Sequence, residues 1–287
     1  MHPRSLNLEN ITIDASVVGK NAIYIENYPN TLIRNVSISN IKSGQRGVSG
    51  IYEIYNIIDY FSKNTETSHF ILMKDQNPEV DCGEMVFFVK SNTISIDLLL
   101  ISKISCGNST KPLGLSLNSI FKCNISNLYL NDINGKTESG IALKIVASNQ
   151  ILISELKIEN VVNTLGSIVL FNESHEIIID SAKISDLISY YNSPIVVNNS
   201  LRFFMSKFSI SKISSHFNNG GCLYLSTGIL GSSFIIQSGN ISECIYNNAK
   251  GGTIYFDSIM AKYLTIFQMH DLLITNCYSD EGSAIFI

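Results

Sequence analysis

Acidic side chains are the residues with which this chain could bind a cation or carry out acid–base chemistry. Asp132, Asp186 and Glu243 each stand directly before the last apolar residue of a recurring phrase, so a repeated structure would align them in one column. Three carboxylates in a column could bind a cation such as Ca²⁺. Other copies of the phrase have Lys103, Asn160 and Lys212 at this place. The mixture favours a solvated outer face whose charges discourage strand pairing, so we expect no metal.

Histidines and arginines offer little further chemistry. His69, His175, His216 and His270 lie far apart without a Ser or Cys partner at a readable spacing, which favours surface or corner positions. The chain has four arginines and no Asp-Asp, Gly-His-Gly or Asn-Thr-Asp sequence. Polysaccharide lyases and glycoside hydrolases use clustered carboxylates with a positioned base. We therefore expect no catalytic residue and no cofactor, and whether the chain is an enzyme stays open, with a non-catalytic role favoured.

The six cysteines do not form a recognisable metal motif. They contain no Cys-x-x-Cys pair and no accompanying histidine spacing, which argues against zinc. We expect buried thiols that pack as small apolar groups, and disulfides between neighbouring turns are the alternative. The six are Cys82, Cys106, Cys123, Cys222, Cys244 and Cys277.

Composition narrows the class of protein that positions these residues. The 287 residues are 45% hydrophobic and 15% charged, with a net charge of −4 and no basic stripe, so neither nucleic acid nor an anionic membrane is an expected partner. No apolar run is long enough to span a membrane. The start has no secretory signal, yet repeats begin near Leu6 and run to Ile287, so we expect a piece of a longer protein.

A phrase of the form apolar-x-apolar-x-x-apolar recurs along the chain. From Ile104 onward, successive copies end 26 to 33 residues apart, at Ile104, Ile133, Val161, Leu187, Ile213, Cys244 and Cys277. Upstream, copies end at Ile11 and Ile41, and the stretch from Ile41 to Ile104 would hold two turns with a degenerate copy at 69–75. These intervals predict about ten rungs of a solenoid.

Each repeat is built from short β-strands. Segments of three to five residues rich in Ile, Val, Phe and Tyr alternate with period two, and no window sustains a helical period. One repeat cannot bury its apolar face alone, whereas stacked repeats form continuous parallel sheets. We predict an all-β parallel β-helix forming one domain over 1–287, with an irregular rung and longer loops at 51–92. A leucine-rich repeat is the alternative, but its fixed Leu and Asn positions are lacking.

Polar corners followed by glycine precede several strands near the end of the chain. Asn and Gly suit sharp turns because both tolerate left-handed backbone. The predicted corner residues are Asn218, Asn219, Gly220, Gly221, Asn247, Asn248, Gly251, Gly252 and Gly282. The sequences "FNNGGCLY" and "YNNAKGGTIY" resemble the GGA[IL] and FxxN repeats of polymorphic-membrane-protein-type surface proteins, also found in large ciliate surface proteins, within the pectin-lyase-like group.

That resemblance implies a right-handed helix, a cell-surface or extracellular location, and adhesive or structural roles with glycans or other surface proteins as partners. The first hypothesis is therefore a non-catalytic segment of such a protein. A polysaccharide lyase or glycoside hydrolase is the alternative. The third hypothesis is a carbohydrate-binding module in which Tyr224 and Tyr255, at equivalent places on successive strands, contact the sugar. The alternation of these strands leaves open which side faces inward, and packing into the interior is the favoured interpretation.

Overall fold

The computed structural model describes most of the chain after residue 92 and separate strands before it. The described residues are 5–9, 12–14, 23–26, 30–39, 52–55, 65–72, 86–89, 93–106, 112–137, 140–216, 221–228, 231–250, 253–257, 265–281 and 285–286. The burial of side chains is described for Ile96, Ile101 and most of these residues from 112 onward.

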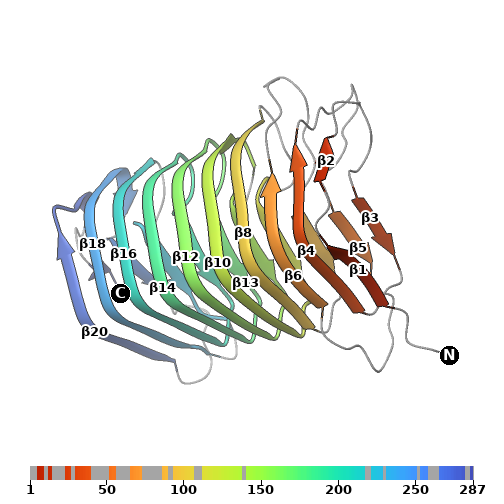
Figure 1. Ribbon diagram of the computed structural model, residues 1–287. Helices are drawn as coiled ribbons and strands as arrows, with labels where there is room; N and C mark the ends of the chain where they lie inside the picture. Colours follow the sequence, from red (N-terminus) through yellow and green to blue (C-terminus); the bar gives the residue numbers. More distant parts are fainter. Residues whose placement is uncertain are drawn as a thin grey trace.

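Every described element is a strand, and from β2 to β20 the strands of two sheets alternate along the chain (Figure 1). Most strands of the first sheet are long, so we call it the long-strand sheet, and those of the second have at most four residues, so we call it the short-strand sheet. The first sheet contains β1 (Ser5–Glu9), β2 (Thr12–Asp14), β4 (Asn30–Ser39), β6 (Thr65–Leu72), β8 (Thr93–Cys106), β10 (Lys122–Gly135), β12 (Gln150–Asn163), β14 (Glu176–Ser189), β16 (Arg202–His216), β18 (Ser233–Lys250), β20 (Ile266–Thr275) and β21 (Tyr278–Glu281). The second contains β3 (Ile23–Glu26), β5 (Tyr52–Tyr55), β7 (Val86–Val89), β9 (Leu115–Asn118), β11 (Leu143–Val146), β13 (Val169–Asn172), β15 (Ile195–Asn198), β17 (Leu223–Ser226), β19 (Ile254–Asp257) and β22 (Ile285–Phe286).

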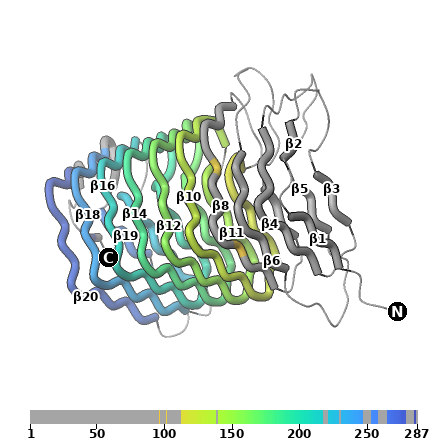
Figure 2. The backbone as a smooth tube through the Cα atoms, viewed as in Figure 1, coloured from red at the N-terminus to blue at the C-terminus, as the bar shows by residue number. Residues whose placement is uncertain are grey.

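All pairings are parallel, and each strand pairs with its equivalent in the next turn, which makes the chain a parallel β-solenoid. Five successive pairs of long and short strands, from β10 to β19, form about five turns, stacked side by side in Figure 2. The register matches the phrase ends predicted from the sequence: Ile104 pairs with Ile133, then Val161, Leu187, Ile213 and Cys244. The all-β parallel solenoid is therefore confirmed.

The predicted alignment at the start of the chain is wrong. The sequence comparison aligned Ile11 with Ile41, but Ile13 pairs with Ile38, so the interval there is 25 residues rather than 30. The text "LNLENITID" contains two overlapping apolar alternations, and the second, not the first, lies beside "VSI". The count of ten rungs, the right-handed sense and the irregular rung at 51–92, most of which lies outside the described residues, stay predictions.

Residues with left-handed backbone explain how one long strand bends around the interior. In β12 the buried positions are 151, 153, 156, 158, 161 and 163, so the gap widens from two to three residues at Glu155 and Asn160. Both have positive φ, at 58° and 54°. A left-handed residue turns the chain without moving the next apolar side chain outward. The x-x of the recurring phrase is therefore a corner.

The interior is a stack of aliphatic and aromatic side chains. Phe171, Phe203 and Phe234 form a line of rings 6.0 and 6.4 Å apart between centroids. Buried serines at one corner accept hydrogen bonds from backbone amides of the preceding turn. The backbone amide of Ile120 donates to Ser148 Oγ, and the amide of Ser148 donates to Ser174 Oγ. The amide of Ser174 donates to Ser200 Oγ at 3.4 Å.

Candidate functional surface

The predicted acidic column exists, and it is a column of backbone corners. Asp132, Asp186 and Glu243 have φ values of 54°, 56° and 55° and share the column with Asn160 and Lys212, which have the same conformation. Lys212 Nζ lies 3.9 Å from Asp186 Oδ1 in the preceding turn. Aspartate and asparagine tolerate left-handed backbone better than most residues, so backbone geometry accounts for much of this column. Within the described residues no group of three His, Cys, Asp or Glu side chains could hold a metal ion.

A compact charged cluster lies on the outer face of β10, β12 and β14. Glu159 binds Lys157 at 2.9 Å and Lys183 at 3.3 Å, and Tyr129 donates its hydroxyl hydrogen to Glu159. The ammonium of Lys157 also lies 4.4 Å from the centroid of the Tyr129 ring, a cation–π contact. Partial burial raises the pKa of Glu159, but hydrogen bonds from the two ammonium groups outweigh it and hold the pKa below its usual range.

Other outward side chains also pair from turn to turn. Asp180 accepts hydrogen bonds from Ser206 at 2.9 Å and from Lys207 at 3.3 Å, which lower its pKa. Arg202 lies 3.6 Å from Glu176. Asparagines form the ladders that the corner chemistry predicts: Asn160 donates to Asn131 and Asn198 donates to Asn172. Ion pairs and hydrogen bonds between outward side chains therefore connect neighbouring turns along the axis of the stack.

Tyr224 and Tyr255 lie on the outer side of the short-strand sheet, where they form a stacked pair. Leu223 and Leu225 are buried and the tyrosines only partly so, which overturns the interpretation that the rings fill the interior. The ring centroids are 5.4 Å apart with planes 13° from parallel. Tyr224 donates its hydroxyl hydrogen to Asp257 Oδ2 at 3.0 Å, and burial followed by this bond raises its pKa to about 12.

The stacking limits what these two tyrosines can bind. Sugars bind best to exposed faces of aromatic rings, but here the facing sides of Tyr224 and Tyr255 cover each other. Carbohydrate contact by this pair stays a prediction, and it would use edges and hydroxyl groups.

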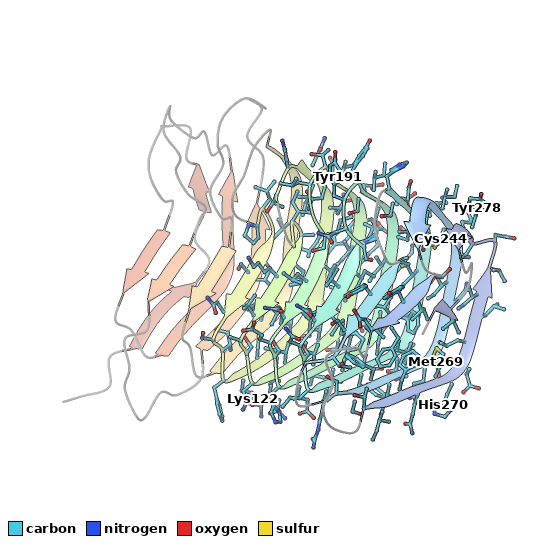
Figure 3. All side chains as sticks on the ribbon, turned by 180° about the vertical axis from the view of Figure 1, so that it is seen from behind. Lys122, Tyr191, Cys244, Met269, His270 and Tyr278 are labelled. Carbon is cyan, nitrogen blue, oxygen red and sulfur yellow. The ribbon has the colours of Figure 1, made fainter. Side chains whose placement is uncertain are left out.

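The histidines of the described turns lie apart. His175 precedes β14, His270 lies on β20 (labelled in Figure 3), and His216 ends β16, where its ring stacks on Tyr190 at 5.2 Å. The side chain of His69 lies outside the described residues. Of the predicted corner residues, Gly221 is buried, and Asn247 and Asn248 fall within β18. The other six, Asn218, Asn219, Gly220, Gly251, Gly252 and Gly282, lie outside the described residues.

Sequence reasoning missed the Glu159 cluster and the tyrosine–aspartate bond. Lys157 and Glu159 stand two apart in "LKIEN", which places them on one face of a strand, so half of the cluster was within reach. Tyr129 and Lys183 join it only through the register between turns.

No helix among the described elements is long and apolar enough to cross a membrane. Comparison of the chain with known protein families, curated proteins and solved structures finds no match.

Proposed function

We propose that this chain is a non-catalytic β-helical segment of a cell-surface or secreted protein, with a structural or adhesive role. The observation that carries the proposal is the turn-to-turn pairing of its outward charged side chains. Glu159 with Lys183, and Asp180 with Lys207, join adjacent turns, and Lys157 pairs with Glu159 within its own turn. Carboxylates engaged in this way are committed to holding the stack together rather than arranged around a substrate.

A stalk needs an axis along which its units are uniformly connected. Here backbone ladders join each turn to the next on both sheets, buried serines continue the connection at one corner, and asparagine pairs continue it outside. Stacks of this kind behave as one-dimensional arrays in which each turn is stabilised by its neighbours. That supports a rigid spacer or a presenting surface.

The adhesive part of the proposal concerns the outer faces. Two features present hydrogen-bonding groups and aromatic edges to a partner: the Glu159 cluster on the long-strand sheet and the Tyr224–Tyr255 pair on the short-strand sheet. Neutral glycans and surface proteins offer the hydroxyl and amide groups that such surfaces recognise. We propose these as the partner classes.

The test compares catalysis and binding in the same preparation of the 287-residue chain. Reaction with acidic and neutral polysaccharides, with and without Ca²⁺, is expected to release no product, while binding to a glycan panel and to immobilised cell-surface proteins is expected at one of the two faces. The variant pairs Y224A/Y255A and K157A/K183A each address one face and serve as controls for each other. Turnover that falls in D132N, D186N or E243Q would overturn the proposal. The absence of both turnover and binding in the unaltered chain would also overturn it.

A further inference from the structure

The last turn of the solenoid leaves its inward side chains partly uncovered. Met269 and Ile274 on β20 pack against the core but are only partly buried, whereas Ile236 and Ile241, their register partners one turn earlier, are fully buried. Cys277, which ends the last copy of the recurring phrase, is also only partly buried. Figure 3 labels Met269 near one end of the stack. The last turn therefore presents an apolar end face.

This end face is also an open edge of both sheets. In the order of the described strands, β20 ends the long-strand sheet and β22 ends the short-strand sheet, so no described strand lies on the outer side of either. A strand edge of this kind is a template for another strand, and uncovered apolar side chains favour its burial. A partner that continues the solenoid must present strands parallel to β20 and β22, with apolar residues at matching intervals.

The opposite end of this same chain has the required pattern. There β1 and β3 begin the two sheets (Figure 1). Followed from strand to strand through its register partners, the column that ends at Met269 begins at Leu8, and the column that ends at Ile274 begins at Ile13. Leu8 and Ile13 are five residues apart, as are Met269 and Ile274. The first turn of one copy, placed on the last turn of another, would align both columns at once.

The short-strand sheet can continue across the same contact. Its column that ends at Ile285 begins at Ile23, and the column that ends at Phe286 begins at Tyr24. Strand β3 begins with Ile-Tyr, as does β19, the strand on which β22 already stacks. The first turn of a second copy can thus follow β22 in the register with which β22 follows β19.

Polar residues at the two ends are complementary as well. The column that ends at His270 begins at Glu9, and the column that ends at Gln268 begins at Asn7. Stacked ends would place an acid beside a base and one amide beside another. Amide pairs of this kind already join adjacent turns within the chain, as Asn160 joins Asn131.

We propose that the last turn of this solenoid binds the first turn of a second copy, so that the chain assembles head to tail. Such a contact is heterologous, because each added copy still offers a free end, and the assembly therefore grows with concentration instead of closing at a dimer. The inference goes beyond the proposed function and does not rest on it, since it uses the two ends of the stack and neither outer face.

The experiment blocks one end at a time with a lysine, whose charge is costly to bury at an apolar contact. M269K alters the last turn and L8K alters the first. In sedimentation velocity, the mass of the unaltered 287-residue chain should rise with concentration beyond twice that of the monomer. Each variant alone should stay monomeric, and an equimolar mixture should reach twice the monomer mass and no more, because only one matching pair of ends remains.

The matched control is L273K. Leu273 lies on the same strand as Met269, but its side chain is 58% exposed, so this variant should associate as the unaltered chain does. An unaltered chain that stays monomeric at every concentration would overturn the inference. Association of L8K alone would also overturn it, because the contact would then not use the first turn.

A second pair of variants tests the contact if the lysine variants do not fold. His270 is exposed, so its replacement leaves the core unchanged. H270E sets a carboxylate beside Glu9 of the next copy and should weaken the association, whereas H270K should keep it; equal association of the two would count against the stacked ends. A monomeric chain would leave the proposed function untouched, because that function is read from turnover and from binding to glycans and proteins.

Discussion

The packing of Phe208 against Gly239 allows the turn-to-turn register to be tested by a single methyl group. Phe208 and Gly239 are register partners on β16 and β18, and both belong to an inward column. A Cβ placed on Gly239 would lie 2.1, 2.2 and 2.6 Å from Cζ, Cε1 and Cε2 of Phe208. The ring therefore occupies the space that a side chain at 239 would fill.

Replacing Gly239 with alanine should consequently destabilise the fold, against the usual trend. In a strand, alanine is favoured over glycine by about 0.5–1 kcal/mol because less backbone entropy is lost. Overpacking a filled core costs about 1–3 kcal/mol, and contacts as short as 2.1 Å place this site at the upper end. The expected net loss for G239A is about 2 kcal/mol.

The rescue uses the identity of the clashing atoms. Leucine lacks the Cζ and Cε atoms, so in an F208L background the same G239A change should cost nothing or stabilise. The coupling energy from the double-mutant cycle should then be about 2 kcal/mol. G228A is the matched control, because a Cβ on Gly228 meets nothing closer than 3.3 Å, the Asn199 Oδ1 atom.

Urea unfolding followed by circular dichroism measures these differences as midpoint shifts at an unchanged slope. G239A should unfold at clearly lower urea than G228A, and F208L/G239A should unfold no earlier than F208L. If G239A matches G228A, or if its cost survives in the F208L background, the register between β16 and β18 is wrong.

Three further results are expected. G114A should lose more stability than G239A in the same urea assay, because its Cβ would lie 1.9 Å from the Ala142 carbonyl oxygen, which already accepts from Leu115; a smaller loss contradicts this packing. Burial raises the pKa of Tyr224 to about 12 and that of Tyr246 above its usual range. The stability that the two protonated hydroxyl groups give the folded state is therefore fully present below the unfolded pKa of about 10 and is lost as the pH rises above it. A urea midpoint that stays constant from pH 9 to 11.5 would refute this expectation. The lowered pKa of Asp180 contributes stability above about pH 4 that is lost on acidification, so D180N should show a shallower fall in midpoint from pH 5 to 3, and an equal fall argues against it.

The sequence by itself determined the repeat, because the signals are local. Alternation with a widened gap is legible in each copy, and the residues that end the copies, such as Ile133, Val161 and Leu187, are register partners in the structure. Where two alternations overlap, as in "LNLENITID", the local signal admitted two alignments and the wrong one was preferred.

The sides of the short strands were decided only in three dimensions. Leu223 and Tyr224 are both apolar enough to face inward, so the alternation could not show which of them faces the interior. The structure shows that Leu223 packs in the core. The acidic column was predicted in sequence, but its cause was not. A positive φ at Asp132 and Asp186 follows from the bend that closes each turn.

Contacts between turns are the part that only the tertiary structure could supply. From the sequence alone, Gly239 is a residue that disfavours a strand. The structure shows that the ring of Phe208 occupies the space of a side chain at position 239. Such contacts depend on loop lengths that vary from turn to turn, so residues far apart in the chain meet at positions that no single repeat encodes.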